Sequence, residues 1–331
     1  MGKIKEDIVL LKNPLMVTSM VFFTFLGFGV GLLLNFPKNE PDTSEQVRLG
    51  TGVFTNPLLE CEVANGTINS PKVYFDVELK SLVKKIVDKK KLTNISLYYR
   101  DMNNGPVISI NDDEFFMPAS LLKVPVMMSY FKRTEIDPSI LSKKIVFTKD
   151  KTVEFTPSFL PEKTLETDHA YTVDELIKRM IMYSDNQALA LLWPGISMNE
   201  YIDLYKALGV DSKVVTDPSH GISIKEYSRF FRILYNSSYL SHDYSEKALE
   251  MLSESTFKDG IRKNIPDEIK VSSKFGERGL GDGVRQLHEC AIVYYPGHPY
   301  LLCIMTKGTD SKILAETISE ISEFIFNKIN N

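Results

Sequence analysis

Cysteine and histidine are scarce in this sequence, and neither residue is arranged as a metal site. Three cysteines and five histidines occur among 331 residues. The cysteines, Cys61, Cys290 and Cys303, form no CxxC pair, and no two histidines stand at metal-ligand spacing. We therefore predict neither a metal centre nor another cofactor.

The positions of Cys290 and Cys303 argue against a disulfide bond. They flank the turn signal P-G-H-P at residues 296–299, which predicts that they lie on the two strands of one hairpin. If Tyr295 opposes Tyr300, the two cysteines are diagonal neighbours. A separation of about 7–8 Å between diagonal positions is too long for a relaxed disulfide. We expect packed, free thiols.

No charge of one sign dominates the chain. Lysine and arginine together number 39 and acidic residues 43, which gives a formal net charge of −4. The longest basic run is the three lysines at residues 89–91, which is typical of a solvated helix end. This balance gives no electrostatic footprint for nucleic acid, so we predict no nucleic-acid partner.

Charge is absent from one long segment near the N-terminus. Residues 14–36 are predominantly apolar and uncharged, and about 20 apolar residues span the hydrocarbon core of a bilayer. Lys3, Lys5 and Lys12 precede the segment, which favours a cytoplasmic N-terminus. We predict a cytoplasmic segment (1–13), a single transmembrane anchor (14–36) and a catalytic domain on the extracytoplasmic side of the cell membrane. A cleaved signal peptide is the alternative, although its apolar stretch is usually only about 7–15 residues long.

The rest of the chain divides into a linker and one folded domain. Residues 37–72 are rich in Pro, Asn, Thr, Gly and acidic residues without periodicity, which predicts a linker or stalk. Hydrophobic periodicity predicts a domain over residues 73–331. Its predicted helices include Tyr74–Leu92, Val173–Met182, Met198–Leu208, Ser223–Tyr235 and Ser311–Ile329, and its predicted strands are Ile95–Arg100, Val107–Ile110, Lys270–Phe275, His288–Tyr295 and Tyr300–Thr306. This order predicts an α+β fold with an antiparallel sheet, packed terminal helices and a mostly helical subdomain.

Three short motifs follow one another in the predicted domain. They are S-L-L-K at Ser120–Lys123, S-D-N at Ser184–Asn186 and K-F-G at Lys274–Gly276. Each alone is weak evidence, because S-x-x-K also occurs, for example, at Ser81–Lys84. Ser120, however, is predicted to begin a helix, and residues three apart share one helix face. Lys123 is therefore expected beside the Ser120 hydroxyl.

This pairing suits nucleophilic catalysis. A serine hydroxyl is a weak nucleophile and needs an adjacent base. Lys123 can be that base only when neutral, so its pKa must fall from about 10.4 through burial or a nearby positive charge such as Lys274. The Ser120 amide, at the start of the helix, can donate to a developing oxyanion. We predict Ser120 as the nucleophile.

The three motifs together resemble those of the class A β-lactamases and the related penicillin-binding serine hydrolases, over roughly residues 74–329. The resemblance implies a β-lactamase/transpeptidase-like fold and an acyl-enzyme on Ser120. It implies that Lys123 is the nearby base and that Ser184 relays a proton to the leaving nitrogen.

The resemblance also implies substrate-binding roles. Asn186 would bind the amide carbonyl of the substrate, and Lys274 would attract its carboxylate. Gly276 belongs to the third motif, and the amide of Glu277 would join that of Ser120 in an oxyanion hole.

Two departures from the family pattern concern deacylation and substrate binding. Class A enzymes carry a Glu-x-x-x-Asn loop whose glutamate activates the deacylating water, but the chain runs from Gly209 to Ile222 without it. Phe275 stands where the family has a threonine, whose hydroxyl binds a substrate carboxylate. Arg278 in the adjoining loop is a candidate substitute for that contact. We therefore expect acylation, followed by slow deacylation.

The predicted function is a serine acyl-enzyme hydrolase that opens β-lactam amides. Its partner would be a small-molecule or peptide substrate, either a β-lactam or a cell-wall peptide. Two alternatives remain open: a D-alanyl-D-alanine carboxypeptidase, transpeptidase or esterase of the cell envelope, and a non-turnover β-lactam-binding sensor.

Overall fold

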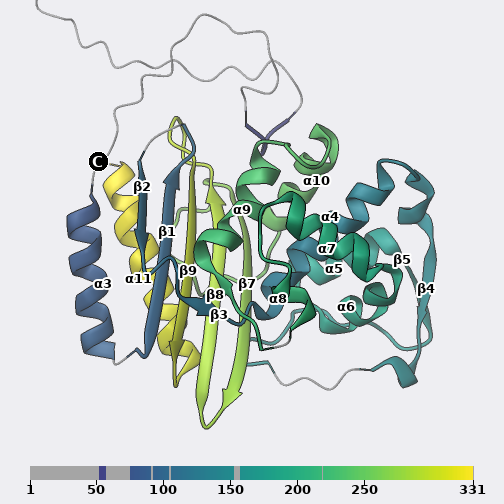
Figure 1. Ribbon diagram of the computed structural model, residues 1–331, viewed down its shortest axis with the longest axis horizontal. Helices are drawn as coiled ribbons and strands as arrows, with labels where there is room; N and C mark the ends of the chain where they lie inside the picture. The colour runs from purple at the N-terminus through teal and green to yellow at the C-terminus, as the bar shows by residue number, and fades with distance from the viewer. Residues whose placement is uncertain are drawn as a thin grey trace, which may run out of the picture. The chain divides into compact units, whose positions relative to one another are not determined.

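A five-stranded antiparallel sheet separates two groups of helices (Figure 1). The computed structural model describes residues 52–56, 75–90, 92–103, 106–152, 157–217 and 219–330. The strand order is β2-β1-β9-β8-β7. The strands are β1 (Asn94–Asp101), β2 (Val107–Ile110), β7 (Val271–Gly281), β8 (Val284–Val293) and β9 (Tyr300–Gly308). Strand β7 therefore forms one edge of the sheet.

Two long helices cover one face of the sheet and create the first core. They are α3 (Asp76–Lys90) and α11 (Ser311–Asn330), the first and last helices of the described domain (Figure 1). Their buried residues recur every three or four positions, as a one-sided helix requires; examples are Leu79, Val83, Ile86, Leu314, Ile318, Ile321 and Ile325. The predicted packing of the terminal helices on one face is confirmed.

The opposite face carries a mostly helical region with a second core. Its helices are α4 (Lys123–Thr134), α5 (Val173–Met182), α6 (Asn186–Leu192), α7 (Met198–Ala207), α8 (Lys213–Thr216), α9 (Ile224–Tyr235) and α10 (His242–Ser253). Short 3-10 helices are η2 (Ala119–Leu122), η3 (Pro138–Ser142), η4 (Lys149–Lys151) and η5 (Trp193–Gly195). Helices α5, α7 and α9 each begin with a capping box, in which a Ser or Thr and a Glu three residues later satisfy each other's backbone amides.

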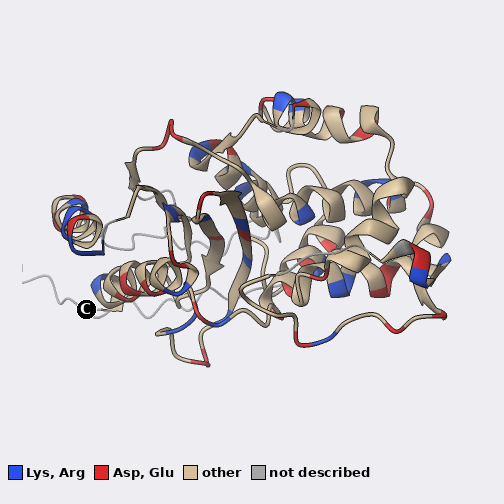
Figure 2. Ribbon diagram, turned by 90° about the horizontal axis from the view of Figure 1, so that it is seen from below, with Lys and Arg blue, Asp and Glu red and all other residues tan. Residues whose placement is uncertain are grey.

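Two short sheets complete the fold. Strand β3 (Phe115–Phe116) pairs with β6 (Ile222–Ser223), and β4 (Lys144–Phe147) pairs with β5 (His169–Thr172). Basic and acidic residues are interspersed along the helices (Figure 2). The α+β architecture agrees with the sequence prediction.

The hairpin of β8 and β9 overturns the prediction of free thiols. Val293 opposes Tyr300, so the connection is two residues longer than we assumed. Cys290 then lies directly opposite Cys303, and a disulfide bond joins them. Turn signals locate a hairpin, but they leave its loop length uncertain, and a shift of register changes every cross-strand pair.

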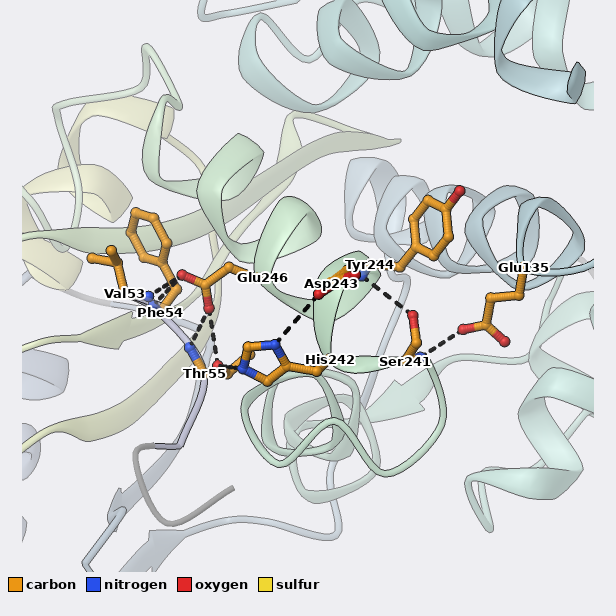
Figure 3. Close-up of polar contacts among 9 residues, drawn as sticks. All are labelled: Val53, Phe54, Thr55, Glu135, Ser241, His242, Asp243, Tyr244 and Glu246. Carbon is orange, nitrogen blue, oxygen red and sulfur yellow. Dashed lines mark hydrogen bonds and ion pairs between the residues drawn. The ribbon is translucent and has the colours of Figure 1, made fainter. Parts of the chain in front are cut away.

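Part of the predicted linker packs against the helical region (Figure 3). The carboxylate of Glu246 on α10 accepts hydrogen bonds from the amides of Val53, Phe54 and Thr55. The hydroxyl of Thr55 also contacts Glu246 and lies 2.9 Å from Nε2 of His242. Phe54 is buried. Residues 52–56 are thus attached to the domain.

The predicted cytoplasmic segment and transmembrane anchor, residues 1–13 and 14–36, lie outside the described residues. Within the described ranges, no helix is both long enough and apolar enough to span a bilayer.

Candidate functional site

Ser120 lies on a tight turn between strand β3 and helix α4. The turn is the 3-10 helix η2, and α4 begins at Lys123. The predicted adjacency is observed, because Nζ of Lys123 lies 3.0 Å from Oγ of Ser120. Ala119, just before the serine, has a φ of 50°. A left-handed conformation is costly for a residue other than glycine, and such strain is concentrated at functional sites.

Side chains from two other elements hold this turn in place. On β8, the side-chain oxygen of Gln286 accepts from the Met117 amide (3.1 Å), and Nε2 of His288 lies 3.1 Å from the Met117 carbonyl oxygen. Burial lowers the pKa of His288 to about 4, so the ring is neutral and Nε2 carries the donated hydrogen. On α9, the Tyr227 hydroxyl donates to the Leu121 carbonyl (3.0 Å). No sequence motif marks these positioning residues.

The three motifs meet around two buried ammonium groups. Nζ of Lys123 donates to the carbonyl oxygen of Ser184 and to Oδ1 of Asn186, each at 2.6 Å, and lies 3.1 Å from Oγ of Ser184. Nζ of Lys274 lies 2.9 Å from the same Ser184 hydroxyl. Lys123, Ser120, Ser184, Asn186 and Lys274, which we call the polar cluster, are therefore joined by one set of hydrogen bonds.

Burial and proximity make it difficult for both lysines to be charged. Each side chain is 0% exposed. Burial lowers the pKa of Lys123 to about 7, although the nearby Asp185 carboxylate opposes the shift. Burial, then the charge of Lys123, lowers the pKa of Lys274 well below its ordinary value, against the attraction of Glu289. A neutral amine at Lys123 is thus accessible near neutral pH.

Asp185, the middle residue of the second motif, positions its neighbours. It caps helix α6, and its carboxylate accepts hydrogen bonds from the amides of Gln187 (2.7 Å) and Ala188 (3.3 Å). Its burial raises the pKa of the carboxyl. Ser184, immediately before it, has a φ of 54°. An aspartate before an apolar helical run is an N-cap signal, so this role was visible in the sequence.

The third motif brings the edge strand β7 against the nucleophile. A Cβ added to Gly276 would lie 3.0 Å from the Ser120 amide nitrogen and 2.9 Å from that of Leu121. Only glycine allows this close approach. The carboxylate of Glu277, the next residue, accepts a hydrogen bond from the Phe159 amide (3.1 Å). A loop from the helical region thus reaches the end of the motif.

A cleft of about 210 Å³ opens beside Ser120. Ser120, Ser184, Asn186 and Glu277 line it, whereas Lys274 and Gly276 do not. Its remaining lining residues include an apolar group, which we call the apolar wall: Pro157, Phe159, Leu160, Pro161 and Phe275. None of the described residues between Gly209 and Ile222 lines the cleft.

Within the ranges that the structure describes, no group of three or more His, Cys, Asp or Glu residues is arranged to hold a metal ion.

A family model described as the β-lactamase enzyme family matches residues 78–329. A comparison with curated proteins finds no match. Many solved structures are similar. A β-lactamase from Xanthomonas campestris pv. campestris has a TM-score of 0.66 at 18% identity, covering 77% of this chain and 98% of its own.

Two further solved structures have the same fold. A class A β-lactamase from Mycobacterium abscessus has a TM-score of 0.64 at 20% identity, covering 77% of this chain and 99% of its own. A mutant of PBP-A, in an acyl-enzyme complex with penicillin G, has a TM-score of 0.65 at 16% identity. The match covers 79% of this chain and 99% of the PBP-A chain. At such low identity these likenesses establish the fold alone.

Proposed function

Because this chain belongs to the β-lactamase enzyme family, we propose that it is a serine acyl-transfer enzyme that forms an acyl-enzyme on Ser120 and releases it slowly. One observation carries the proposal. The buried Nζ of Lys123 lies within hydrogen-bond distance of the hydroxyls of both Ser120 and Ser184. A single base can therefore take the proton of the nucleophile and return a proton to the Ser184 hydroxyl, which protonates the leaving atom.

Acylation follows from this arrangement. Neutral Lys123 takes the proton of Ser120 as Oγ forms a bond to the substrate carbonyl carbon. The amides of Ser120 and Glu277 stabilise the oxyanion. When the bond to the leaving nitrogen or oxygen breaks, the Ser184 hydroxyl donates its proton to that atom and regains one from Lys123. Asn186 binds the amide group of the substrate.

Deacylation lacks a dedicated base in this scheme. The described part of residues 209–222 places no carboxylate in the cleft. The carboxylates that do line it are Asp185, which caps α6, and Glu277, which accepts from the Phe159 amide. Hydrolysis of the ester on Ser120 is therefore expected to be slower than its formation.

We also propose that residues 14–36 anchor the chain and that the domain lies on the extracytoplasmic side of the membrane. The uncharged segment and its preceding lysines support this orientation. The bond between Cys290 and Cys303 is consistent with it, because disulfides persist mainly in oxidising compartments. Protease digestion of intact cells should remove the domain; protection of the domain until the cells are lysed would contradict this orientation.

Intact-mass measurement tests the acyl-enzyme directly. The full-length chain in mild detergent is incubated with penicillin G or its methyl ester, and the mass is followed over time. We expect an adduct of one ligand that forms faster than it disappears, and that is missing in Ser120→Ala. The control Ser81→Ala alters the S-x-x-K decoy on the exposed face of α3 and should keep the adduct. No adduct with either compound, or an adduct in Ser120→Ala, would refute the proposal.

A further inference from the structure

None of the described residues that line the cleft beside Ser120 is a lysine, arginine or histidine. Among the described residues that line it, the charged ones are Asp185 and Glu277, and both are acidic. A substrate carboxylate held here would meet these two carboxyl groups, whereas the amines of Lys123 and Lys274 are buried behind Ser184 and do not line the cleft. Removing an ion from water without a partner is costly. The lining therefore disfavours an anionic group.

The family resemblance assigns Lys274 to carboxylate binding, but its amine is buried and hydrogen-bonded within the protein. Its side chain is fully buried and does not line the cleft. Its ammonium donates to the Phe275 carbonyl (2.9 Å) and contacts the Ser184 hydroxyl, and it lies 4.4 Å from the centroid of the Phe275 ring. An ammonium group has three donors, and two of these are already engaged. The residue that follows Lys274 supplies an aromatic ring where the family has a threonine hydroxyl.

Phe275 belongs to a packed aromatic group beside the cleft. Its ring stacks on that of Phe257, with 4.1 Å between centroids and 19° between planes. Phe159 packs edge-on against Phe257 at 5.0 Å. Leu160 extends the apolar wall outward and is 80% exposed. Large exposed apolar side chains next to a cleft commonly mark a binding surface.

Three further cationic residues of this region also lie outside the lining of the cleft. Arg285 lines a separate pocket of about 660 Å³ and donates to the Ser158 hydroxyl (3.1 Å). Lys163 lies over the Tyr183 ring, 5.8 Å from its centroid. Arg278, the candidate substitute from the sequence, is exposed on β7. None of the three lines the cleft.

We propose that the acyl donors of this protein carry an uncharged, apolar group where β-lactams and D-alanyl peptides carry a carboxylate, so that neutral esters and amides are its preferred substrates. This inference rests on the proposed acyl-enzyme at Ser120 and adds the substrate class to it. Apolar groups gain by burial against the apolar wall, and they avoid the repulsion that an anion meets at the acidic lining.

A matched pair of acyl donors tests the inference on the unmodified protein. Penicillin G and its methyl ester share one reactive amide and differ only in the carboxylate. The rate constant for adduct formation on Ser120 is measured for each by intact mass under single-turnover conditions. We expect the methyl ester to react at least about tenfold faster than the acid.

Three variants test whether the residues that line the cleft set this preference. Leu160→Arg places a cation at the apolar wall on an exposed side chain and should lower the ester-to-acid ratio by about threefold to tenfold. Leu280→Arg makes the same change at a partly exposed residue that does not line the cleft, and should leave the ratio unchanged. Phe275→Thr restores the family's hydroxyl and should lower the ratio further, provided that thermal melting shows a folded protein.

The outcomes separate this inference from the proposed function. A faster reaction of the ester, reduced in Leu160→Arg but not in Leu280→Arg, supports the inference. A faster reaction of the acid in the unmodified protein overturns it while leaving the acyl-enzyme intact. An equal effect of both arginine variants also overturns it, since the cleft lining would then not set the preference. Labelling by neither compound refutes the proposed function and, with it, this inference.

Discussion

The polar cluster, through Ser120, Ser184 and Asn186, and the apolar wall line the same cleft, but only the polar cluster agrees with the family pattern. In the polar cluster, Lys123 contacts Ser120, Ser184 and Asn186 through hydrogen bonds, which is the arrangement that the three motifs predict. In the apolar wall, Phe275 replaces an expected hydroxyl and packs against other aromatic rings. We therefore propose that the chain keeps the acylation chemistry of the family and differs from it in the substrates that it recognises.

The largest expected effect comes from removing the base of the polar cluster. Lys123→Met keeps the volume of the side chain but removes the amine, so acylation of Ser120 should slow by about 10³–10⁴-fold. Its melting temperature reports on stability separately, because the variant loses a costly buried amine but leaves the Ser184 carbonyl and Asn186 Oδ1 without that donor. Single-turnover mass measurements and thermal melting check both points. Lys84→Met, in the S-x-x-K decoy on α3, is the control; an equal loss in that variant would contradict the assignment.

A smaller effect is expected where the polar cluster meets the edge strand. Gly276→Ala places a methyl group about 3 Å from the backbone nitrogens of Ser120 and Leu121. Because backbone cannot move aside cheaply, the oxyanion donors should shift and acylation should slow by about 10²-fold. Gly279→Ala, on the same strand with nothing within 4 Å, is the matched control. Similar rates in the two variants would show that the close approach is unimportant.

The smallest effect on acylation is expected behind the apolar wall. Gly260→Ala places a methyl group 1.9 Å from Oε2 of Glu289 and 2.8 Å from the Phe257 ring. Overpacking at this buried position should lower the free energy of unfolding by about 1–3 kcal/mol. Acylation should change only a few-fold, because the methyl group meets Glu289 and Phe257 rather than Ser120, Lys123 or Ser184. Urea denaturation and single-turnover rates measure the two quantities; a 10²-fold loss of rate would indicate that the wall also positions the nucleophile.

The polar cluster was largely predictable from the sequence. Ser120 and Lys123 are three residues apart at a helix start, so local geometry brings them together. Ser184 and Asn186 precede an apolar helical run, and Lys274 and Gly276 lie on a strand with a polar face, so each motif had a local signal. The meeting of the three motifs followed from the family resemblance.

The apolar wall and two other features were not predictable, because they depend on contacts between distant segments. Phe159 and Leu160 lie in a loop without periodicity, and only the folded chain brings Phe159 to Glu277. Residues 52–56 have the composition of a linker, yet Glu246, far away in sequence, binds their amides. The disulfide was missed because the length of the hairpin loop sets the register.

The pH dependence of Ser120 acylation tests the central claim most directly, because that claim requires a neutral Lys123. Its pKa is lowered to about 7, so below that pH the amine is protonated and cannot accept the serine proton. Single-turnover rates with penicillin G methyl ester between about pH 5.5 and 8.5 should rise roughly tenfold per unit below about 7 and level off above it. A rate that still rises tenfold per unit at the upper limit, as an ordinary lysine requires, or that is independent of pH throughout, would contradict the account.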